Sequence, residues 1–185
     1  YETNQVSLFD KLISCFALIP FEDIIKKRRA PQDEEYAKAC EMVSRLPIWL
    51  INAGGQSVSW VSATAASKKA DVVIVDYLQL IPGRGSSRYE VVTNISMQLH
   101  TMAQTTGRLV VALAQINRGG ADAPKVQDLK ESGQIEQDAD AIILLGKGEE
   151  EYYFSLAKNK RGITGDLHIT FDGNYQRFSE VTDCE

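Results

Sequence analysis

The chain has 185 residues, enough for one domain with a substantial buried core. Its composition, 44% hydrophobic and 24% charged, is average for a soluble globular protein, and no segment approaches the roughly 20 apolar residues of a membrane span. We find no secretory signal pattern in these residues and expect none to act, and a net charge of −5 indicates no general affinity for nucleic acid, although a local basic patch can still provide one.

The cysteines and histidines do not form the pattern of a metal site. Cys15, Cys40 and Cys184 lie far apart and lack paired spacing, which favours free thiols in a reducing compartment over a disulfide framework or a zinc site. His100 and His168 are also isolated, so each is expected to be a surface or structural residue rather than a ligand.

The first 46 residues are expected to form helices. A second and a third helix are expected after Pro20 and Pro31, because proline suits the first helical turn and acidic residues follow both prolines. In the first helix, apolar residues at three- and four-residue spacing predict one buried face: Val6, Phe9, Leu12, Ile13 and Phe16.

The middle of the chain alternates between predicted strands and helices. Helices are expected at 57–69 and 89–106, the second stopped by Gly107. Continuous apolar runs predict buried strands around them: 47–52, 72–76, 109–115 and 141–146. This order predicts an α/β fold, in which a parallel sheet has helices on both faces and binds ligands at the C-terminal ends of its strands.

The C-terminal region predicts an antiparallel hairpin. Residues 151–158 and 166–172 alternate in the manner of strands on either side of the turn "NKRGITG", and "YQRF" at 175–178 adds a short last strand.

Two polar residues end neighbouring predicted strands. In P-loop ATPases an acid at the position of Asp76 holds magnesium, directly or through water, while the ion bridges the nucleotide phosphates. The alternative is an aspartate that leads the strand into a turn. Gln115 ends the next strand, where its amide can contact a γ-phosphate or an attacking water, or can be an ordinary polar strand end.

Two further segments are candidates for function. The loop 117–140 is long for a compact domain, and such loops are often functional, although the charges of residues 117–133 cancel and a solvated surface loop remains the alternative. The turn "KNKRG" at 158–162 contains three cations in four residues. These are either a solvated surface or a group that reaches a neighbouring subunit's γ-phosphate, as an arginine finger does.

Four motifs together resemble the C-terminal, RecA-like motor domain of DnaB-type replicative helicases: "VIVDYLQLI", "ALAQINR", "DLKESGQIEQDADAIILL" and "AKNKRGITGDLHITFDGNYQRF". They occur in that family's order and span nearly the whole chain, and the loop at 128–140 is the most specific. The resemblance implies a RecA-like P-loop NTPase core, with a mostly parallel sheet, helices on both faces and a C-terminal antiparallel hairpin.

The resemblance also implies roles for residues at the expected nucleotide site. Asp76 matches the Walker B magnesium ligand, and Gln115 matches the γ-phosphate sensor. Glu2, in "YETN", aligns with the glutamate that polarises the attacking water.

The cationic turn departs from the family's pattern. Lys158 matches the family's hairpin lysine, but the arginine that is common two residues later is replaced by Lys160, with Arg161 next. Lysine lacks the planar fork of arginine, so either Lys160 takes the role or Arg161 shifts into it.

The expected ligands and partners follow from the same resemblance. Lys130, Glu131 and Gly133 match a loop that follows the backbone of single-stranded DNA in the channel of a hexameric ring, which suits a motor that must pass any base. ATP and Mg²⁺ are the implied cofactors of the whole protein. Further copies of the chain, primase and a helicase loader are its implied partners. The implied reaction is ATP-driven, 5′-to-3′ DNA unwinding in the cytoplasm, without a membrane.

One motif of the family is absent from the sequence. No G-x-x-x-x-G-K-[ST] occurs in residues 1–185, and the first residue is Tyr rather than Met. We therefore expect a single motor-domain fragment that lacks the first strand and the P-loop, is inactive alone and exposes apolar sheet surface. The alternatives are another RecA-like ring ATPase, which the loop at 128–140 disfavours, and a catalytically dead assembly module of the same fold.

Overall fold

The structure is a computed structural model that describes residues 1–27, 33–116, 124–128, 133–148 and 152–181. The chain forms two compact units. The first comprises Tyr1–Glu2 and Ala53–Leu167, and the second comprises Thr3–Asn52 and His168–Glu185.

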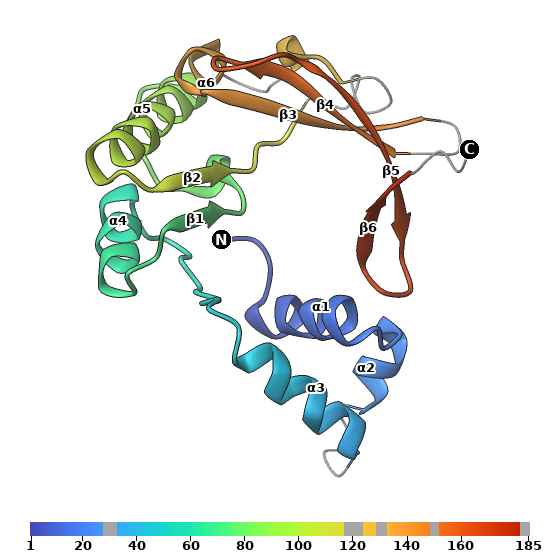
Figure 1. Ribbon diagram of the computed structural model, residues 1–185. Helices are drawn as coiled ribbons and strands as arrows, with labels where there is room; N and C mark the ends of the chain where they lie inside the picture. The colour runs from blue at the N-terminus through green and yellow to red at the C-terminus, as the bar shows by residue number, and fades with distance from the viewer. Residues whose placement is uncertain (28–32, 117–123, 129–132, 149–151, 182–185) are drawn as a thin grey trace. The chain divides into compact units, whose positions relative to one another are not determined.

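A two-stranded parallel sheet lies within the first unit (Figure 1). Its strands, β1 (Val72–Val75) and β2 (Leu109–Ala112), pair in register from Val72 opposite Leu109 to Val75 opposite Ala112. The strands predicted at 72–76 and 109–115 are confirmed, each shorter than expected.

Helices α4 (Val58–Ser67) and α5 (Arg88–Thr106) cover one face of this sheet (Figure 1). Gly107 ends α5 in the left-handed conformation, with φ of 68°, as the sequence predicts. No helix of the described ranges is long and apolar enough to cross a membrane. The buried core joins both helices to β1 and to the short helix η1 (Leu78–Leu80): Val58, Val61, Ala65, Val75, Leu78, Ile81, Val92, Ile95, Leu99 and Met102.

The opposite face of the parallel sheet is apolar and exposed. Successive side chains of a strand point to opposite faces, so alternate residues of β1 and β2 lie together on this open sheet face. These side chains, with that of Leu113 just after β2, are well exposed: Val72 48%, Ile74 67%, Leu109 60%, Val111 37% and Leu113 46%. The structure thus has the exposed apolar sheet surface that the sequence leads us to expect.

The C-terminal strands form a second sheet, in the order β3, β4, β5 and β6. The strand predicted at 141–146 lies here, where it pairs antiparallel with β4 instead of joining β1 and β2, because an apolar run indicates burial but not the partner. The predicted hairpin is confirmed. The four strands are β3 (Ala141–Lys147), β4 (Tyr152–Asn159), β5 (Gly165–Asp172) and β6 (Arg177–Glu180).

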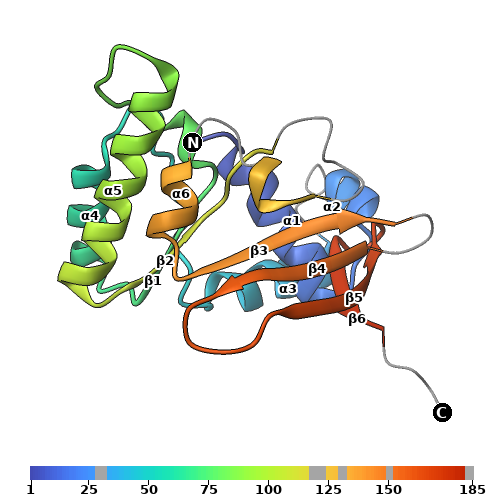
Figure 2. The ribbon, with the colours of Figure 1, turned by 90° about the horizontal axis from the view of Figure 1, so that it is seen from above.

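Two short helices precede this sheet. The first is η3 (Val126–Asp128), in which the Asp128 carboxylate accepts a hydrogen bond from the backbone N–H of Lys125, the residue before the helix, at 2.8 Å. α6 (Gly133–Asp138) then packs against α5, as Figures 1 and 2 both show.

The second unit contains the three predicted N-terminal helices, α1 (Gln5–Ala17), α2 (Phe21–Lys27) and α3 (Glu34–Ser44). Pro31 lies outside the described residues, and the Asp33 side chain caps α3. The helices share a small core: Ile13, Ile19, Ile24, Ala39 and Val43. The buried face predicted for α1 is correct at its centre, but its two ends, Val6 and Phe16, are about half exposed.

The strand predicted at 47–52 is wrong. This segment forms no strand among the described residues, and the apolar Ile48, Trp49 and Ile51 are exposed. It leads out of the second unit towards Ala53, where the first unit resumes. A short apolar run alone does not distinguish a buried strand from an extended connection.

Candidate active site

The candidate site begins where the two parallel strands end. β1 ends at Val75 and β2 at Ala112, so the residues that follow lie at one edge of the sheet. Hydrogen bonds continue past the strands, because the Leu113 N–H donates to the Val75 carbonyl at 3.0 Å and the Leu78 N–H donates to the Leu113 carbonyl at 2.9 Å. The edge that carries Asp76 and Gln115 is therefore held together by the backbone.

Asp76 is half-buried and is the first residue after β1. The peptide bond that joins it to Tyr77 is cis. Its carboxylate is an oxygen ligand of the kind that Mg²⁺ prefers.

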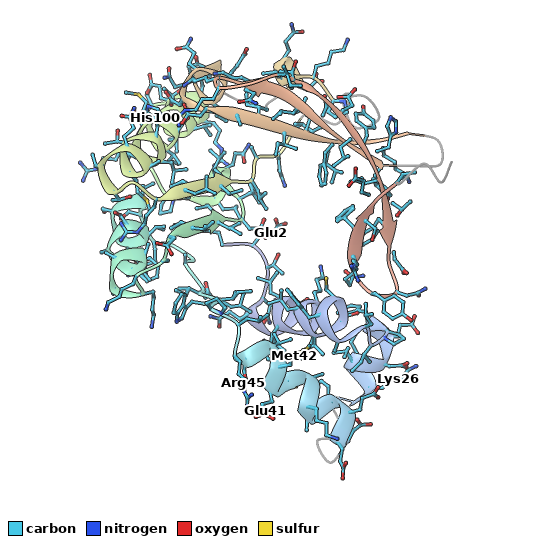
Figure 3. All side chains as sticks on the ribbon, viewed as in Figure 1. Glu2, Lys26, Glu41, Met42, Arg45 and His100 are labelled. Atoms are coloured by element: carbon cyan, nitrogen blue, oxygen red, sulfur yellow. The ribbon has the colours of Figure 1, made fainter. Side chains whose placement is uncertain are left out.

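Glu2 lies beside Asp76. Its backbone N–H donates to the Asp76 carbonyl at 3.2 Å, and its side chain is exposed near the end of β1 (Figure 3). The neighbouring Tyr1 holds Glu2 close to Asp76. Tyr1 packs on the first-unit core, and its hydroxyl donates to the Gln56 carbonyl at 2.8 Å. Two residues 74 positions apart in the sequence are thereby brought together.

Gln115 has an exposed side chain and a backbone held by Gln79. The Gln79 amide donates to the Gln115 carbonyl at 3.3 Å and accepts from the Gln115 N–H at 3.3 Å. Gln79 is 4% exposed, and its own carbonyl accepts from the Arg88 guanidinium at 2.5 Å. Sequence reasoning missed this residue, and the only signal was a glutamine between two leucines directly after the candidate strand.

The hairpin cations lie elsewhere in the first unit. The Lys158 ammonium donates to the Glu136 carbonyl of α6, and Lys160 forms an ion pair with Asp140 at 3.0 Å. Arg161 is exposed at the turn. Figure 1 shows the turn between β4 and β5 close to α6 and away from the end of β1. Within one chain, Lys158 and Lys160 therefore contact α6 and Asp140 rather than Asp76.

The ion pair lowers the pKa of Asp140. The hydrogen bond and the charge of Lys160 are the main causes, with smaller contributions from the charges of His100 and Arg161. Lys160 also donates its backbone N–H to the Asp140 carbonyl at 2.9 Å. Lys160 is thus held by its own chain through two contacts, whereas Arg161 is exposed.

Of the three residues predicted to contact DNA, the structure describes Gly133. Lys130 and Glu131 lie outside the described residues, and Gly133 begins α6. The Asp138 carboxylate of α6 accepts from the Ser96 hydroxyl of α5 at 2.7 Å and from the Gln134 amide at 2.8 Å. The helix that follows the loop is therefore anchored to the core.

The acidic residues fit a magnesium ion held jointly with phosphates. No cluster of three or more His, Cys, Asp or Glu side chains occurs among the residues that the structure describes. Mg²⁺ commonly binds proteins through one or two carboxylates together with substrate phosphates, and Asp76 supplies one at the expected edge.

Comparison with known proteins decides the family. Residues 1–180 match the DnaB-like helicase C terminal domain. The chain belongs to this family. Membership explains why the motifs occur in the same order, and it argues against a different type of RecA-like ring ATPase.

Individual relatives agree with this assignment. The DnaB-like chain is 30% identical to the replicative DNA helicase DnaB of Mycobacterium intracellulare over 97% of its own length and 35% of that protein. It is 31% identical to the corresponding helicase of Leifsonia xyli, over 97% of its own length and 44% of that protein. The chain thus spans less than half the length of these relatives.

Solved structures are similar as well. A DnaB-like replicative helicase, studied with its interactions with primase, superposes with a TM-score of 0.86 at 27% identity, over 98% of this chain and 49% of that one. A second solved structure, described as an ATPase domain, gives a TM-score of 0.84 at 27% identity, over 98% of this chain and 72% of that one. The DnaB-like fold is confirmed, and nucleotide is the class of ligand that the family implies.

Proposed function

We propose that this chain is part of the motor of an ATP-dependent replicative DNA helicase, which translocates on single-stranded DNA and unwinds duplex as a hexameric ring. The observation that carries the proposal is the meeting of Asp76, Glu2 and Gln115 at one edge of the parallel sheet. Family membership supports the proposal independently of that geometry.

Each residue of the edge has a distinct role in the proposal. Asp76 binds Mg²⁺, directly or through water, and the ion when bound neutralises charge on the β- and γ-phosphates. Gln115 contacts the γ-phosphate or the attacking water with its exposed amide. Glu2 orients and polarises that water, and its backbone bond to Asp76 keeps the two carboxylates at the same edge.

Arg161 is the favoured cation for a neighbouring subunit's nucleotide. Lys160 is ion-paired with Asp140 of its own chain, so releasing it would cost a hydrogen bond and a charge interaction. Arg161 is exposed, and its planar guanidinium suits bidentate contact with phosphate. Lys158 contacts α6, so we assign it to holding the hairpin in position.

DNA contact is assigned to the loop that ends at α6. Lys130 supplies charge, and Glu131 and Gly133 belong to the same proposed contact with the DNA backbone. The anchoring of Asp138 to Ser96 supports this, since a loop that transmits force needs a fixed base. Contacts with phosphates alone carry no sequence information, which suits a motor.

We propose that the remaining parts of the helicase lie in the whole protein, outside residues 1–185. These are the P-loop, which the sequence does not contain, and the surfaces for primase and a loader. Primase interaction is reported for one similar helicase, and cytoplasmic replication is the setting that we propose. The chain alone is then inactive in ATP hydrolysis.

DNA-stimulated ATP hydrolysis by the full-length protein tests the proposal. We expect Asp76→Ala to abolish stimulated turnover, and an unchanged rate would refute the magnesium role. A catalytically dead assembly module is the second candidate, favoured only by the missing P-loop motif. An upstream reading frame without a P-loop would decide for that module.

A further inference from the structure

The side chain of Gln79 replaces backbone pairing beyond the end of the parallel sheet. β2 ends at Ala112, yet Gln115, three residues later, still has both backbone groups paired, by one side chain. A carboxamide carries a donor and an acceptor as a peptide group does, so Gln79 can pair with Gln115 as a strand backbone would.

Neighbouring contacts fix Gln79 itself. Its carbonyl accepts from Arg88 at 2.5 Å, and its side chain is 4% exposed. The backbone bond from Leu78 to Leu113 already keeps the two segments together. The Gln79 amide is therefore not needed to join the segments, and its separate effect is on the backbone at Gln115.

We propose that Gln79 is a positioning residue, which holds Gln115 in the orientation needed to sense the γ-phosphate; this inference rests on the proposed function. The exposed side chain of Gln115 takes its direction from its backbone, and in the described residues that backbone is held by Gln79. Gln79 also lies three residues after Asp76, so one short segment carries the magnesium ligand and orients the sensor.

The test uses the full-length protein and compares four variants. Gln79→Met keeps a side chain of similar length and removes both hydrogen bonds, while Gln115→Ala removes the sensor. The double variant combines the two. Gln98→Ala is the matched control, because Gln98 is an exposed glutamine on α5.

Kinetics give the first readout. We expect Gln79→Met to lower kcat of DNA-stimulated ATP hydrolysis about tenfold, with KM for ATP changed less than about twofold. In the Gln115→Ala background the same substitution has no further effect, because Gln79 acts through Gln115. Gln98→Ala leaves both parameters unchanged.

Hydrogen exchange gives the second readout, and it reports the pairing directly. Gln79→Met should speed exchange at the Gln115 N–H and spare the Leu113 N–H, which donates to Val75. Equal acceleration at both amides contradicts the inference, since it indicates general opening of the edge. Unchanged exchange at Gln115 contradicts it too.

The outcomes separate the inference from the proposed function. If Gln115→Ala lowers kcat but Gln79→Met leaves kcat unchanged, the inference is overturned and the proposed function is not. Equal losses from Gln79→Met in both backgrounds also overturn it. An unchanged kcat in Gln115→Ala overturns the sensor role, and with it the catalytic part of the inference.

Discussion

Removing the Ser96 hydroxyl should loosen α6 and the proposed DNA loop. This hydroxyl donates to the Asp138 carboxylate at 2.7 Å, and Ser96 is only 8% exposed. Hydrogen bonds to charged groups contribute about 1.5 to 3 kcal/mol, and the partial exposure of this pair favours the lower value. A loss of about 1.5 kcal/mol corresponds to a roughly tenfold increase in the opening equilibrium of α6.

The assay is hydrogen exchange at the Ala139 N–H, which donates to the Ile135 carbonyl at the end of α6. In the full-length protein, Ser96→Ala should speed this exchange about tenfold. Thr101→Ala is the matched control, because the Thr101 hydroxyl on the same helix donates to the Met97 carbonyl and is exposed. Single-stranded DNA binding by fluorescence anisotropy should weaken in Ser96→Ala and not in the control.

Two results would refute this reasoning. Equal exchange rates in Ser96→Ala and in the wild type would mean that the bond to Asp138 does not anchor α6. Faster exchange with unchanged DNA affinity would mean that the stability of α6 does not affect DNA binding by the loop.

Three further predictions concern stability, ionisation and association. Ile95→Ala empties a fully buried position and should cost about 3 kcal/mol in urea unfolding, whereas Ile163→Ala, at 89% exposure, should cost almost nothing; equal costs would contradict the core assignment. Lys160→Ala should raise the pKa of Asp140 towards 3.8, observed by NMR titration. Because the ion pair lowers the pKa of Asp140 in the folded chain, it stabilises the folded state above pH 3.8, and this stabilisation is lost as pH falls through the folded pKa. An unchanged Asp140 pKa in Lys160→Ala would exclude the ion pair. The chain alone should self-associate through the open sheet face, and Ile74→Lys should reduce this in sedimentation; a cooperative, strictly monomeric melt of the unmodified chain would argue against it.

Much of the first unit could be predicted from local patterns. The stripe Val92, Ile95, Leu99 and Met102, with Gly107 as the stop, predicts α5 to within one residue at its start. Apolar runs likewise locate the strands that became β1 and β2. These elements were predictable because their burial is periodic or continuous along the chain.

Sheet membership was less predictable than strand formation. The run at 141–146 predicts a strand, but its pairing with β4 depends on residues that follow it in the chain. The run at 47–52 is as apolar, yet it forms no strand among the described residues. In both cases hydrogen-bond partners, rather than hydrophobicity, decide the outcome.

The candidate site was predictable where a motif carried it. Asp76 and Gln115 were identified from strand ends, and Glu2 from a few residues that resemble the family. Gln79 was missed because its role depends on pairing with a segment 36 residues away. A contact of that kind leaves no periodic signal in one sequence.

Duplex unwinding by the full-length protein tests the central claim most directly. The measurement is ATP-dependent strand displacement on a forked DNA substrate, compared among the wild type, Asp76→Ala and Asp71→Ala. Asp71 is the matched control, because it lies at the opposite end of β1. We predict unwinding by the wild type and Asp71→Ala, and at least about a hundredfold loss in Asp76→Ala. Unwinding by Asp76→Ala at the wild-type rate would contradict the account.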